Sequence, residues 1–600
     1  MKNQKPISRS FENPKEEIEY YLEIWRKERE EEEREFVYSK VSGFQISSYR
    51  NRGGRDISIT LEKKNIEKNL KDYQKGSPIA ILGTALKLRG VISKIEKDSI
   101  TVFCRTKEEI EEFTGLSIQR VFSNVGEEDI LKSATNLLEN TKRLHQLLGY
   151  KEFALSVIRE QALEFEQGTP SQKECMQKIL YHEDFVAIWG PPGTGKTTLI
   201  IESVRELLKQ NKKVLLVASS NFACDVLVEK TREITNSITR LGSSSRISEE
   251  VLEYSLEEKW ENSDENKLSQ NAIQDLRKVQ AKIANLYSKP FSKREGLAEL
   301  KQERKFLESM ISKTEEVYTK YILESSNVII GTPASTRILF RLGLKFDCLF
   351  FDEATQTNLL ESLIPIPLAT KLILIGDPKQ LGPYSKEIPS LLEKTLENQN
   401  ILATRSGNLL EQFRMEDEIA TFSNKTFYEN KLENRKKKSQ AQTSSLFTSK
   451  IVWIDTSSTD AEEFFDGESY QNELEIQVVG NLLETLELEL TDTKSEITVL
   501  TPYSSQRLLL EERIFPKAKV FTVDGFQGRE SEIIILSLVR TEKIGFLEEA
   551  RRLNVALTRA KDLLVIVGNS ECFSESILFQ KLLKTIEEKG EVVSAWSFIY

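Results

Sequence analysis

The chain opens with hydrophobic and polar residues in helical spacing, from residue 14 to residue 36. The apolar positions of this segment fall on one stripe: Ile18, Leu22, Ile24 and Trp25. Most of the remaining positions are charged, and Pro14 suits the first turn of a helix. The pattern predicts an N-terminal stalk helix within residues 1–36.

The period then falls to two, which is typical of half-buried strands. Ile57, Ile59 and Leu61 alternate with polar residues, and Lys97-Asp98 forms a turn between two further alternating segments. We expect a small β-barrel accessory domain over residues 37–104. Helical spacing returns over residues 105–165, which predicts a helical connector.

Short apolar runs separated by helical patterns follow, the arrangement of buried parallel strands flanked by helices. The runs in the first set are 186–189, 214–218, 328–330, 348–351 and 372–375. The runs in the second set are 451–454, 497–500, 519–521, 533–538 and 563–567. They predict an α/β protein with two tandem lobes, over residues 166–400 and 401–600.

The α/β pattern is interrupted between about residues 244 and 322. Apolar residues recur there at heptad spacing on both sides of Ser288-Lys289-Pro290: Leu276, Val279, Ile283, Leu286, Leu300, Leu307 and Met310. Heptad spacing on both sides of a turn indicates two antiparallel helices. We therefore expect a helical hairpin inserted into the first lobe.

The composition limits the class of protein but does not identify its binding partner. The chain has 600 residues, 39% hydrophobic and 30% charged, and a net charge of −10. No apolar run approaches the roughly 20 residues that span a bilayer, so we expect no membrane partner. Five scattered cysteines and two histidines argue against disulfides and zinc, so the expected location is the reducing cytoplasm. The acidic balance does not exclude nucleic acid, because a local basic groove is sufficient.

A phosphate-binding loop lies between a predicted strand and a predicted helix. Its residues match the pattern GxxxxGK[ST]: Gly190, Pro191, Pro192, Gly193, Thr194, Gly195, Lys196 and Thr197, followed by Thr198. Backbone N–H groups of such a loop converge on phosphate oxygens. Lys196 is expected to neutralise the β- and γ-phosphates of ATP, and Thr197 to ligate Mg²⁺.

Two carboxylates follow the apolar run 348–351. Asp352 is placed to hold the Mg²⁺ shell, and Glu353 to orient and deprotonate the attacking water. An adjacent Asp-Glu pair is common on surfaces, but its position after a buried strand downstream of a phosphate loop favours catalysis. The sequence thus predicts ATP hydrolysis, with ATP and Mg²⁺ as cofactors.

Further motifs occur in the order of a known helicase family. They are Thr169–Gln172, Ala218–Asn221, Gly376–Pro383, Glu411–Met415, Val523–Glu530 and Arg551–Ala560. Together they resemble superfamily 1B helicases, in particular the subfamily of the nonsense-mediated-decay helicase, senataxin and the immunoglobulin mu-binding-protein helicase. The resemblance runs from about residue 169 to 570. It implies two RecA-like lobes with an N-terminal helix-plus-barrel and a helical insertion as accessory domains.

The resemblance also implies roles at the nucleotide. Gln172 is expected to bind the adenine edge, Phe413 to stack on the base, and Glu530 to hold the ribose. Phe413 stands where many relatives carry tyrosine, so the ring face is kept and a hydroxyl contact is lost. Gln380 is expected to sense the γ-phosphate. Arg414 and Arg559, both in the second lobe, are expected to reach across the cleft as arginine fingers.

For nucleic acid, the resemblance implies small polar residues at strand ends. They are Ser220, Asn221, Thr332, Pro333, Thr501, Pro502, Tyr503, Thr522 and Asp524. Such residues suit contacts to phosphates and sugars, which carry no sequence code. Ordinary turn chemistry is the alternative reading of the same residues. The run Arg435–Lys438 suits a solvated loop, a phosphate contact or a targeting signal.

The resemblance makes the chain a 5′–3′ helicase or translocase on single-stranded RNA or DNA, acting as a monomeric motor. The alternative is an ATP-gated clamp or remodeller of RNA–protein complexes with little unwinding. A small-molecule P-loop kinase is disfavoured by the paired lobes and the two arginines of the second lobe. The choice between RNA and DNA, the processivity, the pathway and the protein partners stay open.

Overall fold

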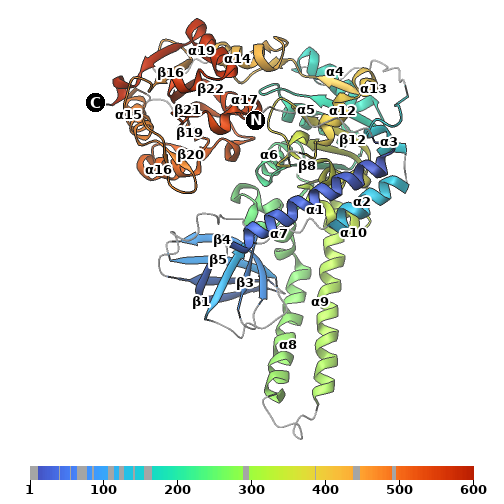
Figure 1. The fold of residues 1–600 in the computed structure, drawn as a ribbon. Helices are drawn as coiled ribbons and strands as arrows, with labels where there is room; N and C mark the ends of the chain where they lie inside the picture. The colour runs from blue at the N-terminus through green and yellow to red at the C-terminus, as the bar shows by residue number, and fades with distance from the viewer. Residues whose placement is uncertain are drawn as a thin grey trace.

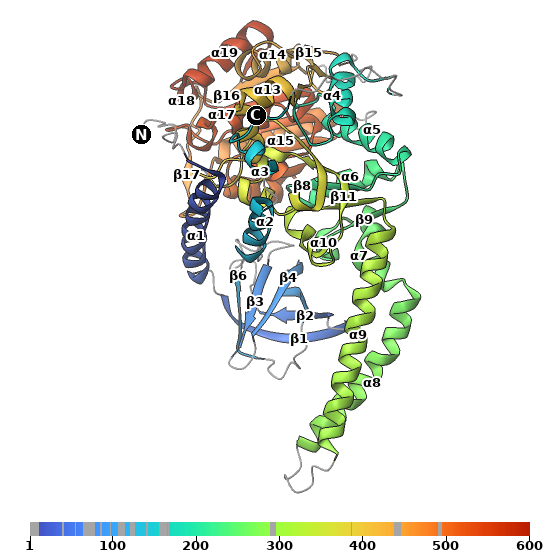
Figure 2. The ribbon, with the colours of Figure 1, turned by 90° about the vertical axis from the view of Figure 1, so that its right-hand side faces the viewer.

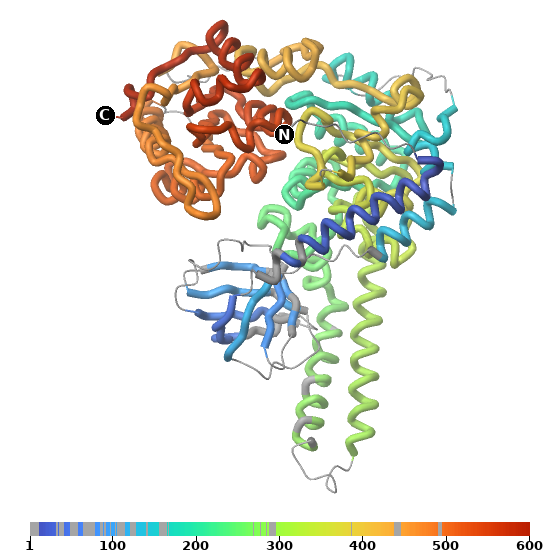
Figure 3. The backbone as a smooth tube through the Cα atoms, in the orientation of Figure 1, coloured from blue at the N-terminus to red at the C-terminus, as the bar shows by residue number. Residues whose placement is uncertain are grey.

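The computed structural model describes most of the chain. The described residues are 11–38, 41–53, 56–63, 78–83, 87–96, 98–105, 114–120, 127–139, 142–154, 165, 167–287, 296–385, 387–436, 446–489 and 495–599. Two α/β lobes lie side by side, and a barrel and a long helical pair project from the first lobe (Figure 1). The backbone tube shows the same division, with the chain entering lobe 1 after the barrel (Figure 3).

The N-terminal helix α1 (Pro14–Tyr38) runs along lobe 1 beside α2 (Glu127–Glu139), as Figures 1 and 2 show. Its predicted apolar stripe is buried: the exposed fractions of Ile18 and Trp25 are 2% and 6%. Glu17 fixes the helix to lobe 1, because its carboxylate pairs with Lys394 at 2.7 Å and accepts from the Tyr150 hydroxyl at 2.9 Å. The first half of the stalk helix, up to Trp25, is therefore packed against lobe 1.

Six strands form a closed barrel in the order β1-β2-β5-β4-β3-β6. Their bounds are β1 Val41–Gly53, β2 Asp56–Glu62, β3 Pro78–Leu82, β4 Lys87–Glu96, β5 Ser99–Arg105 and β6 Leu116–Arg120. The predicted pairing of the two segments around Lys97-Asp98 is confirmed, because β4 and β5 pair antiparallel from Glu96 opposite Ser99; Lys97 itself lies outside the described residues. The predicted end at residue 104 is wrong. The barrel closes only through β6, which pairs with both β1 and β3 and lies in the span assigned to the helical connector.

Lobe 1 is a seven-stranded parallel sheet in the order β13-β7-β12-β11-β8-β10-β9. Its strands are β7 Phe185–Trp189, β8 Val214–Ala218, β9 Ile238–Arg240, β10 Val328–Gly331, β11 Phe346–Asp352, β12 Ala369–Gly376 and β13 Ser406–Asn408. Its helices, with the connector helix α3, are α3 Lys142–Leu147, α4 Pro170–Tyr181, α5 Lys196–Lys209, α6 Asn221–Thr231, α10 Arg337–Arg341, α11 Leu359–Ser362, α12 Leu391–Glu397 and α13 Gln399–Thr404. Alternate side chains of each strand enter one of two cores, one on each face of the sheet.

The predicted boundary between the lobes at residue 400 is also wrong. The strand β13 pairs with β7 and so extends lobe 1 to Asn408. A strand of Ser-Gly-Asn carries no apolar signal, which is why its pairing was not visible in the sequence.

The insertion in lobe 1 contains α7 (Leu256–Glu261), α8 (Asp264–Tyr287) and α9 (Leu297–Ser325), and α8 and α9 pack together. The pair extends far beyond the sheet (Figure 2). Its apolar core is thin: Val279, Ile283 and Leu307 are buried, whereas the predicted core residue Met310 is 40% exposed. Two helices alone leave one side of each apolar stripe open to solvent.

Lobe 2 is a six-stranded parallel sheet in the order β20-β19-β21-β22-β16-β23. Its sheet strands are β16 Ile451–Asp455, β19 Ile497–Thr501, β20 Lys519–Thr522, β21 Ser531–Ser537, β22 Ala560–Gly568 and β23 Glu591–Ser594. Short pairs are formed by β14 Glu411–Gln412 with β15 Glu433–Asn434, and by β17 Phe464–Phe465 with β18 Tyr470–Gln471. The helices are α14 Asp417–Phe427, α15 Glu473–Glu489, α16 Ser504–Ile514, α17 Ala550–Leu557, α18 Ser570–Phe573 and α19 Ile577–Lys589. The strands that hydrophobic runs predicted in both lobes are all confirmed.

A fully buried carboxyl group makes the stability of lobe 2 depend on pH. Burial raises the pKa of Glu475 to about 8, although Ser537 and the Val539 backbone N–H donate to it. The folded protein then holds a proton that the unfolded chain releases above a pKa of about 4.3. The stabilisation that the folded state gains from this bound proton is fully present below pH ~4.3. It is lost as the pH rises to about 8.

We expect Glu475→Gln to remove this pH dependence, because an amide does not titrate. Between pH 6 and pH 8 the wild type should lose up to about 1.4 kcal/mol of unfolding free energy per pH unit more than the variant. Denaturant unfolding of both proteins at the two pH values measures the difference. Equal losses would contradict the assignment to Glu475.

Candidate nucleotide site and strand interface

The phosphate-binding loop joins β7 to α5 at the carboxyl edge of the lobe 1 sheet. Gly193 and Gly195 have φ of +72° and +79°, the left-handed region that glycine adopts without strain. A Cβ on Gly193 would lie 2.6 Å from the Cβ of Arg414, so only glycine permits this approach of the second lobe. Thr194 closes the loop through its hydroxyl, which donates to the Pro191 carbonyl at 2.8 Å. Pro191 and Pro192 are buried, whereas Thr198 is exposed.

Lys196 and Glu353 form an ion pair beside this loop. The Lys196 ammonium lies 3.4 Å from Oε1 of Glu353 and donates to the Gly190 carbonyl at 3.0 Å. Glu353 follows β11 with φ of +49°, a conformation that is uncommon for a residue with a Cβ. The structure thus brings together the loop lysine and the acidic residue that the sequence predicted as the base.

The two adjacent carboxyl groups have opposite pKa shifts. Burial and the neighbouring charge of Glu353 raise the pKa of Asp352. Burial also raises that of Glu353, but the positive charges of Lys196 and Arg559 outweigh it and lower the net pKa. Glu353 is therefore ionised at neutral pH, as a group that accepts a proton from water must be.

The donor set fits a magnesium ion at the nucleotide. Asp352 is 6% exposed and forms no ion pair among the described residues. Its one hydrogen-bond partner there is the Glu353 backbone N–H at 2.9 Å, so its carboxylate oxygens remain available as ligands. Mg²⁺ at phosphates uses one or two protein oxygens, here a carboxylate and the Thr197 hydroxyl, with water and phosphate as the remaining ligands.

Two arginines of the second lobe reach the same centre. Arg559, between α17 and β22, is 3% exposed and donates from Nη2 to Oε1 of Gln380 in lobe 1 at 3.0 Å. Arg414 donates to the Thr558 carbonyl at 3.1 Å and pairs with Glu530 at 2.5 Å. Burial and the charge of Arg414 lower the pKa of Arg559 to about 10, so it stays charged at neutral pH. Glu530, expected at the ribose, pairs with Arg414 and with Lys561 in this structure.

Residues that the sequence did not single out join the lobes beside this centre. Asp377 is fully buried, and its carboxylate accepts from Gln380 at 2.9 Å and from the Tyr428 hydroxyl at 2.8 Å. Asn554 in lobe 2 donates to that hydroxyl at 2.7 Å and to the Lys379 carbonyl at 2.9 Å. Asp377 and Asn554 lie within quoted motifs, but no local pattern marks Tyr428. Together they hold Gln380 against Arg559.

The residues expected at the base both contact the backbone of the phosphate-binding loop. Gln172 caps α4 with Thr169 and donates to the Thr194 carbonyl at 3.0 Å, so it has both the helix-capping role and contact with the loop. Phe413 is 43% exposed, and its backbone N–H donates to the Gly193 carbonyl at 2.9 Å. A solvent-exposed ring held at the loop is suited to stacking on a base.

The residues expected to contact nucleic acid fall into two groups, one accessible to solvent and one buried. Six are half-buried or exposed: Ser220, Asn221, Thr332, Pro502, Thr522 and Asp524. Pro333, Thr501 and Tyr503 are buried, and Tyr503 packs against Tyr470 and Phe546. The structure does not present the side chains of these three to a strand.

A buried ion pair positions Asn221. Arg240 in β9 is fully buried, pairs with Asp225 at 3.0 Å and donates to Oδ1 of Asn221 at 3.0 Å. Removing one partner of a buried pair leaves an uncompensated charge. The loop that carries Asn221 therefore depends on this pair.

We expect Arg240→Met to destabilise the protein by about 3–5 kcal/mol, because Asp225 would be left buried and unpaired. The double variant Arg240→Met/Asp225→Leu should recover most of the loss, since both charges are then absent. Denaturant unfolding of the three proteins measures this. A double variant as unstable as the single one would show that the charge is not the cause.

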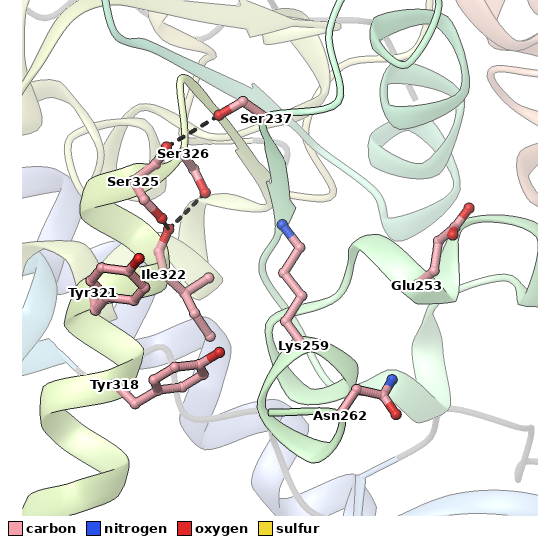
Figure 4. Close-up of a pocket in the computed structure, with 9 residues that line it drawn as sticks. All are labelled: Ser237, Glu253, Lys259, Asn262, Tyr318, Tyr321, Ile322, Ser325 and Ser326. Atoms are coloured by element: carbon pink, nitrogen blue, oxygen red, sulfur yellow. Dashed lines mark hydrogen bonds between the residues drawn. The ribbon is translucent and has the colours of Figure 1, made fainter. Parts of the chain in front are cut away.

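A cavity of about 460 Å³ lies at the base of the helical pair, away from the nucleotide site. Tyr318, Tyr321 and Ser325 of α9 face Lys259 of α7 across it (Figure 4). Ser237 beside β9 donates to the Ser325 carbonyl at 3.2 Å and so joins the sheet to the helix. The cavity marks the joint between lobe 1 and the helical insertion.

Where the structure describes the basic run at residue 435, Arg435 is exposed, as expected of a solvated loop, whereas Lys436 is not. Lys436 is largely buried and pairs with Asp562 at 2.5 Å and Glu416 at 3.2 Å. Arg435 pairs with Glu433 at 2.8 Å. Lys437 and Lys438 lie outside the described residues. Within the described parts of the chain, no helix is both long and apolar enough to cross a membrane.

A phosphate loop and base in one lobe, completed by arginines of the next, define a P-loop ATPase whose site closes between two lobes. Two family models, both described as AAA domains, match residues 168–387 and 389–571. The DNA polymerase alpha-associated DNA helicase A of Schizosaccharomyces pombe is 28% identical over 558 residues, covering 87% of this chain and 83% of that protein. An uncharacterized ATP-dependent helicase of Methanocaldococcus jannaschii is 32% identical, covering 70% and 71% respectively. The DNA-binding protein SMUBP-2 of Rattus norvegicus is 30% identical, and the match covers 72% of this chain and 46% of that protein.

The chain belongs to the superfamily 1B helicases of the Upf1-like group and is an ATP-dependent helicase.

Proposed function

We propose that the protein is a monomeric motor that moves 5′ to 3′ along single-stranded DNA or RNA, driven by hydrolysis of Mg²⁺-bound ATP. The observation that carries the proposal is the division of one site between two lobes: Lys196 and Glu353 come from the first, and Arg414 and Arg559 from the second. ATP bound there is contacted from both sides, so its hydrolysis changes how the lobes are held together. All of these groups belong to one chain, so a monomer is sufficient.

Each lobe is inferred to be RecA-like, with its parallel sheet ending at the shared site. Gln172, Phe413 and Glu530 are assigned to the nucleoside, and Gln380 to the γ-phosphate. Asp352 and Thr197 would hold Mg²⁺, which neutralises phosphate charge when bound. Arg559 and Arg414 are then placed to stabilise charge on the transferring phosphoryl group. The 5′–3′ direction rests on the resemblance of the motifs.

The strand is assigned to the carboxyl edges of both sheets, over Ser220, Asn221 and Thr332 in lobe 1 and Thr522 in lobe 2. Hydroxyl and amide groups at such edges bind phosphates and sugars of any sequence. Arg529 of lobe 2 lies 4.0 Å over the ring of Phe222, next to Asn221, so this edge also carries a contact between the lobes. The barrel and the helical pair are assigned to flank the path of the strand.

The test is ATP hydrolysis by the full chain without polymer, with poly(U) RNA and with single-stranded DNA. We expect strong stimulation by at least one polymer, and the more effective polymer identifies the substrate class. Turnover that is equal in all three conditions would overturn the assignment of a strand.

Displacement of a labelled strand from a 5′-tailed duplex then separates a translocating motor from a clamp, because a clamp hydrolyses ATP without displacing the strand.

A further inference from the structure

A chain of two hydrogen bonds connects the strand edge of lobe 1 to the expected catalytic base. The Ser219 hydroxyl donates to Oε1 of Gln356 at 2.7 Å. The side-chain amide of Gln356 donates from Nε2 to Oε2 of Glu353 at 3.2 Å. Ser219 directly follows β8, and Gln356 ends the 3-10 turn η6 (Ala354–Gln356) that begins after Glu353.

The orientation of the Gln356 amide is fixed by both of its neighbours. The carboxylate of Glu353 only accepts, so it requires the N–H end of the amide. The oxygen end then faces Ser219, whose hydroxyl can donate. A flipped amide would place its oxygen against a carboxylate oxygen, which is repulsive. Gln356 therefore fixes Glu353 in one orientation only while its own other end is held.

Gln356 becomes more important once ATP is bound. In the structure the two oxygens of Glu353 have separate partners, Oε1 the Lys196 ammonium and Oε2 the Gln356 amide. The lysine of a phosphate-binding loop moves to the β- and γ-phosphates of ATP. Gln356 then remains as the side-chain partner of Glu353 among the described hydrogen bonds. The Glu353 backbone, at φ of +49°, leaves the carboxylate dependent on such a partner.

The other end of the chain of bonds lies where a strand would bind. Ser219 precedes Ser220, which is exposed and whose hydroxyl caps α6 by accepting from the Ala223 N–H at 3.1 Å. A phosphate at this exposed cap contacts the segment that holds the Ser219 hydroxyl. A small shift of Ser219 changes the position of Gln356 and through it that of Glu353.

We propose that Gln356 is a positioning residue that couples occupancy of the strand-binding segment 219–221 to the orientation of the Glu353 carboxylate. This inference rests on the proposed function, since it requires a strand at that edge. Gln356 does not touch nucleotide or strand in this arrangement. Its effect is on the geometry of the water-activating group, where a misplacement of about 1 Å costs up to about 100-fold in rate.

The test compares variants of the full chain in ATP hydrolysis with and without saturating polymer. Gln356→Met keeps the length of the side chain and removes the amide, and Ser219→Ala removes the hydroxyl donor. Both should lower the polymer-stimulated kcat by about tenfold or more, with KM for ATP within about twofold of wild type. Ser219→Thr keeps a hydroxyl and should retain stimulation. The double variant should be no worse than Gln356→Met, because both changes break one chain of bonds.

The matched control is Ser203→Ala in α5, a buried serine whose hydroxyl has no hydrogen-bond partner among the described residues, and it should behave as wild type. Wild-type turnover that does not respond to polymer would overturn the proposed function itself. Normal stimulation in the wild type together with normal stimulation in Gln356→Met or Ser219→Ala would overturn only the coupling. Additive losses in the double variant would likewise overturn it, since the two residues would then act separately.

Discussion

Glu353→Gln is expected to lower kcat for ATP hydrolysis by about 10²- to 10⁴-fold, the usual contribution of a positioned general base. The amide keeps the shape of the side chain but cannot take a proton from water. ATP binding should persist. The affinity for ATP can rise, because Lys196 no longer has to break an ion pair with residue 353 before it contacts the phosphates. Steady-state hydrolysis and calorimetric titration with ATP measure the two effects separately.

The control for this variant is Glu265→Gln, on the exposed first turn of α8 and remote from the site. It should retain wild-type turnover. If Glu353→Gln hydrolysed ATP within tenfold of the wild type, Glu353 would not be the base. A loss of ATP binding would instead indicate that the substitution had disturbed the phosphate-binding loop.

Arg559→Ala is expected to lower kcat by about 10³-fold or more, the contribution of an arginine finger to phosphoryl transfer. The guanidinium is buried and contacts Gln380 of the other lobe, so no water replaces its charge at the phosphate. Arg559→Lys should recover little, because an ammonium lacks the planar fork that spans two oxygens. Single-turnover hydrolysis at saturating ATP measures the chemical step directly.

Arg559 also has a structural role, and its effect on folding must be measured separately from its effect on catalysis. Its Nε donates to the Val555 carbonyl at 3.0 Å and its Nη1 to the Arg529 carbonyl at 3.1 Å, so its loss leaves buried acceptors unpaired. Thermal unfolding of each variant therefore accompanies the kinetics. Arg513→Ala is the matched control, because that exposed arginine of α16 in lobe 2 makes a surface ion pair with Glu473. Equal losses in Arg513→Ala and Arg559→Ala would refute the finger.

The strands were predictable where their burial produces continuous apolar runs, as in β8 and β11. Both are central in a parallel sheet and covered on both faces, which leaves little choice of residue. The edge strand β13 was not predictable, since Ser-Gly-Asn pairs through its backbone alone. The closing strand β6 was missed for a related reason: its partners β1 and β3 are distant in sequence, and pairing between distant segments leaves no local pattern.

At the nucleotide site, too, the sequence predicted only those residues that local motifs mark. Lys196 and Glu353 follow from local motifs, because phosphate and water impose fixed chemistry on neighbouring residues. Tyr428 was not predictable, because its role arises only when Asp377 and Asn554 meet it from two lobes. The burial of Tyr503 is likewise a tertiary property, since Tyr470 and Phe546 cover it from segments on either side in the sequence.

The buried contacts that join the lobes at Tyr428 have a consequence for how the motor responds to salt. The bond from Tyr428 to Asp377 has a neutral donor and is buried, where dissolved ions screen little. The bond from Asn554 to the Lys379 carbonyl joins two neutral groups and is partly buried. Binding to a nucleic-acid backbone releases counterions and weakens steeply as salt rises. Ionic strength therefore acts on the two contacts unequally. A rise in ionic strength should release the nucleic-acid strand while the two lobes stay together. The helicase then dissociates from the strand with its ATP site still assembled.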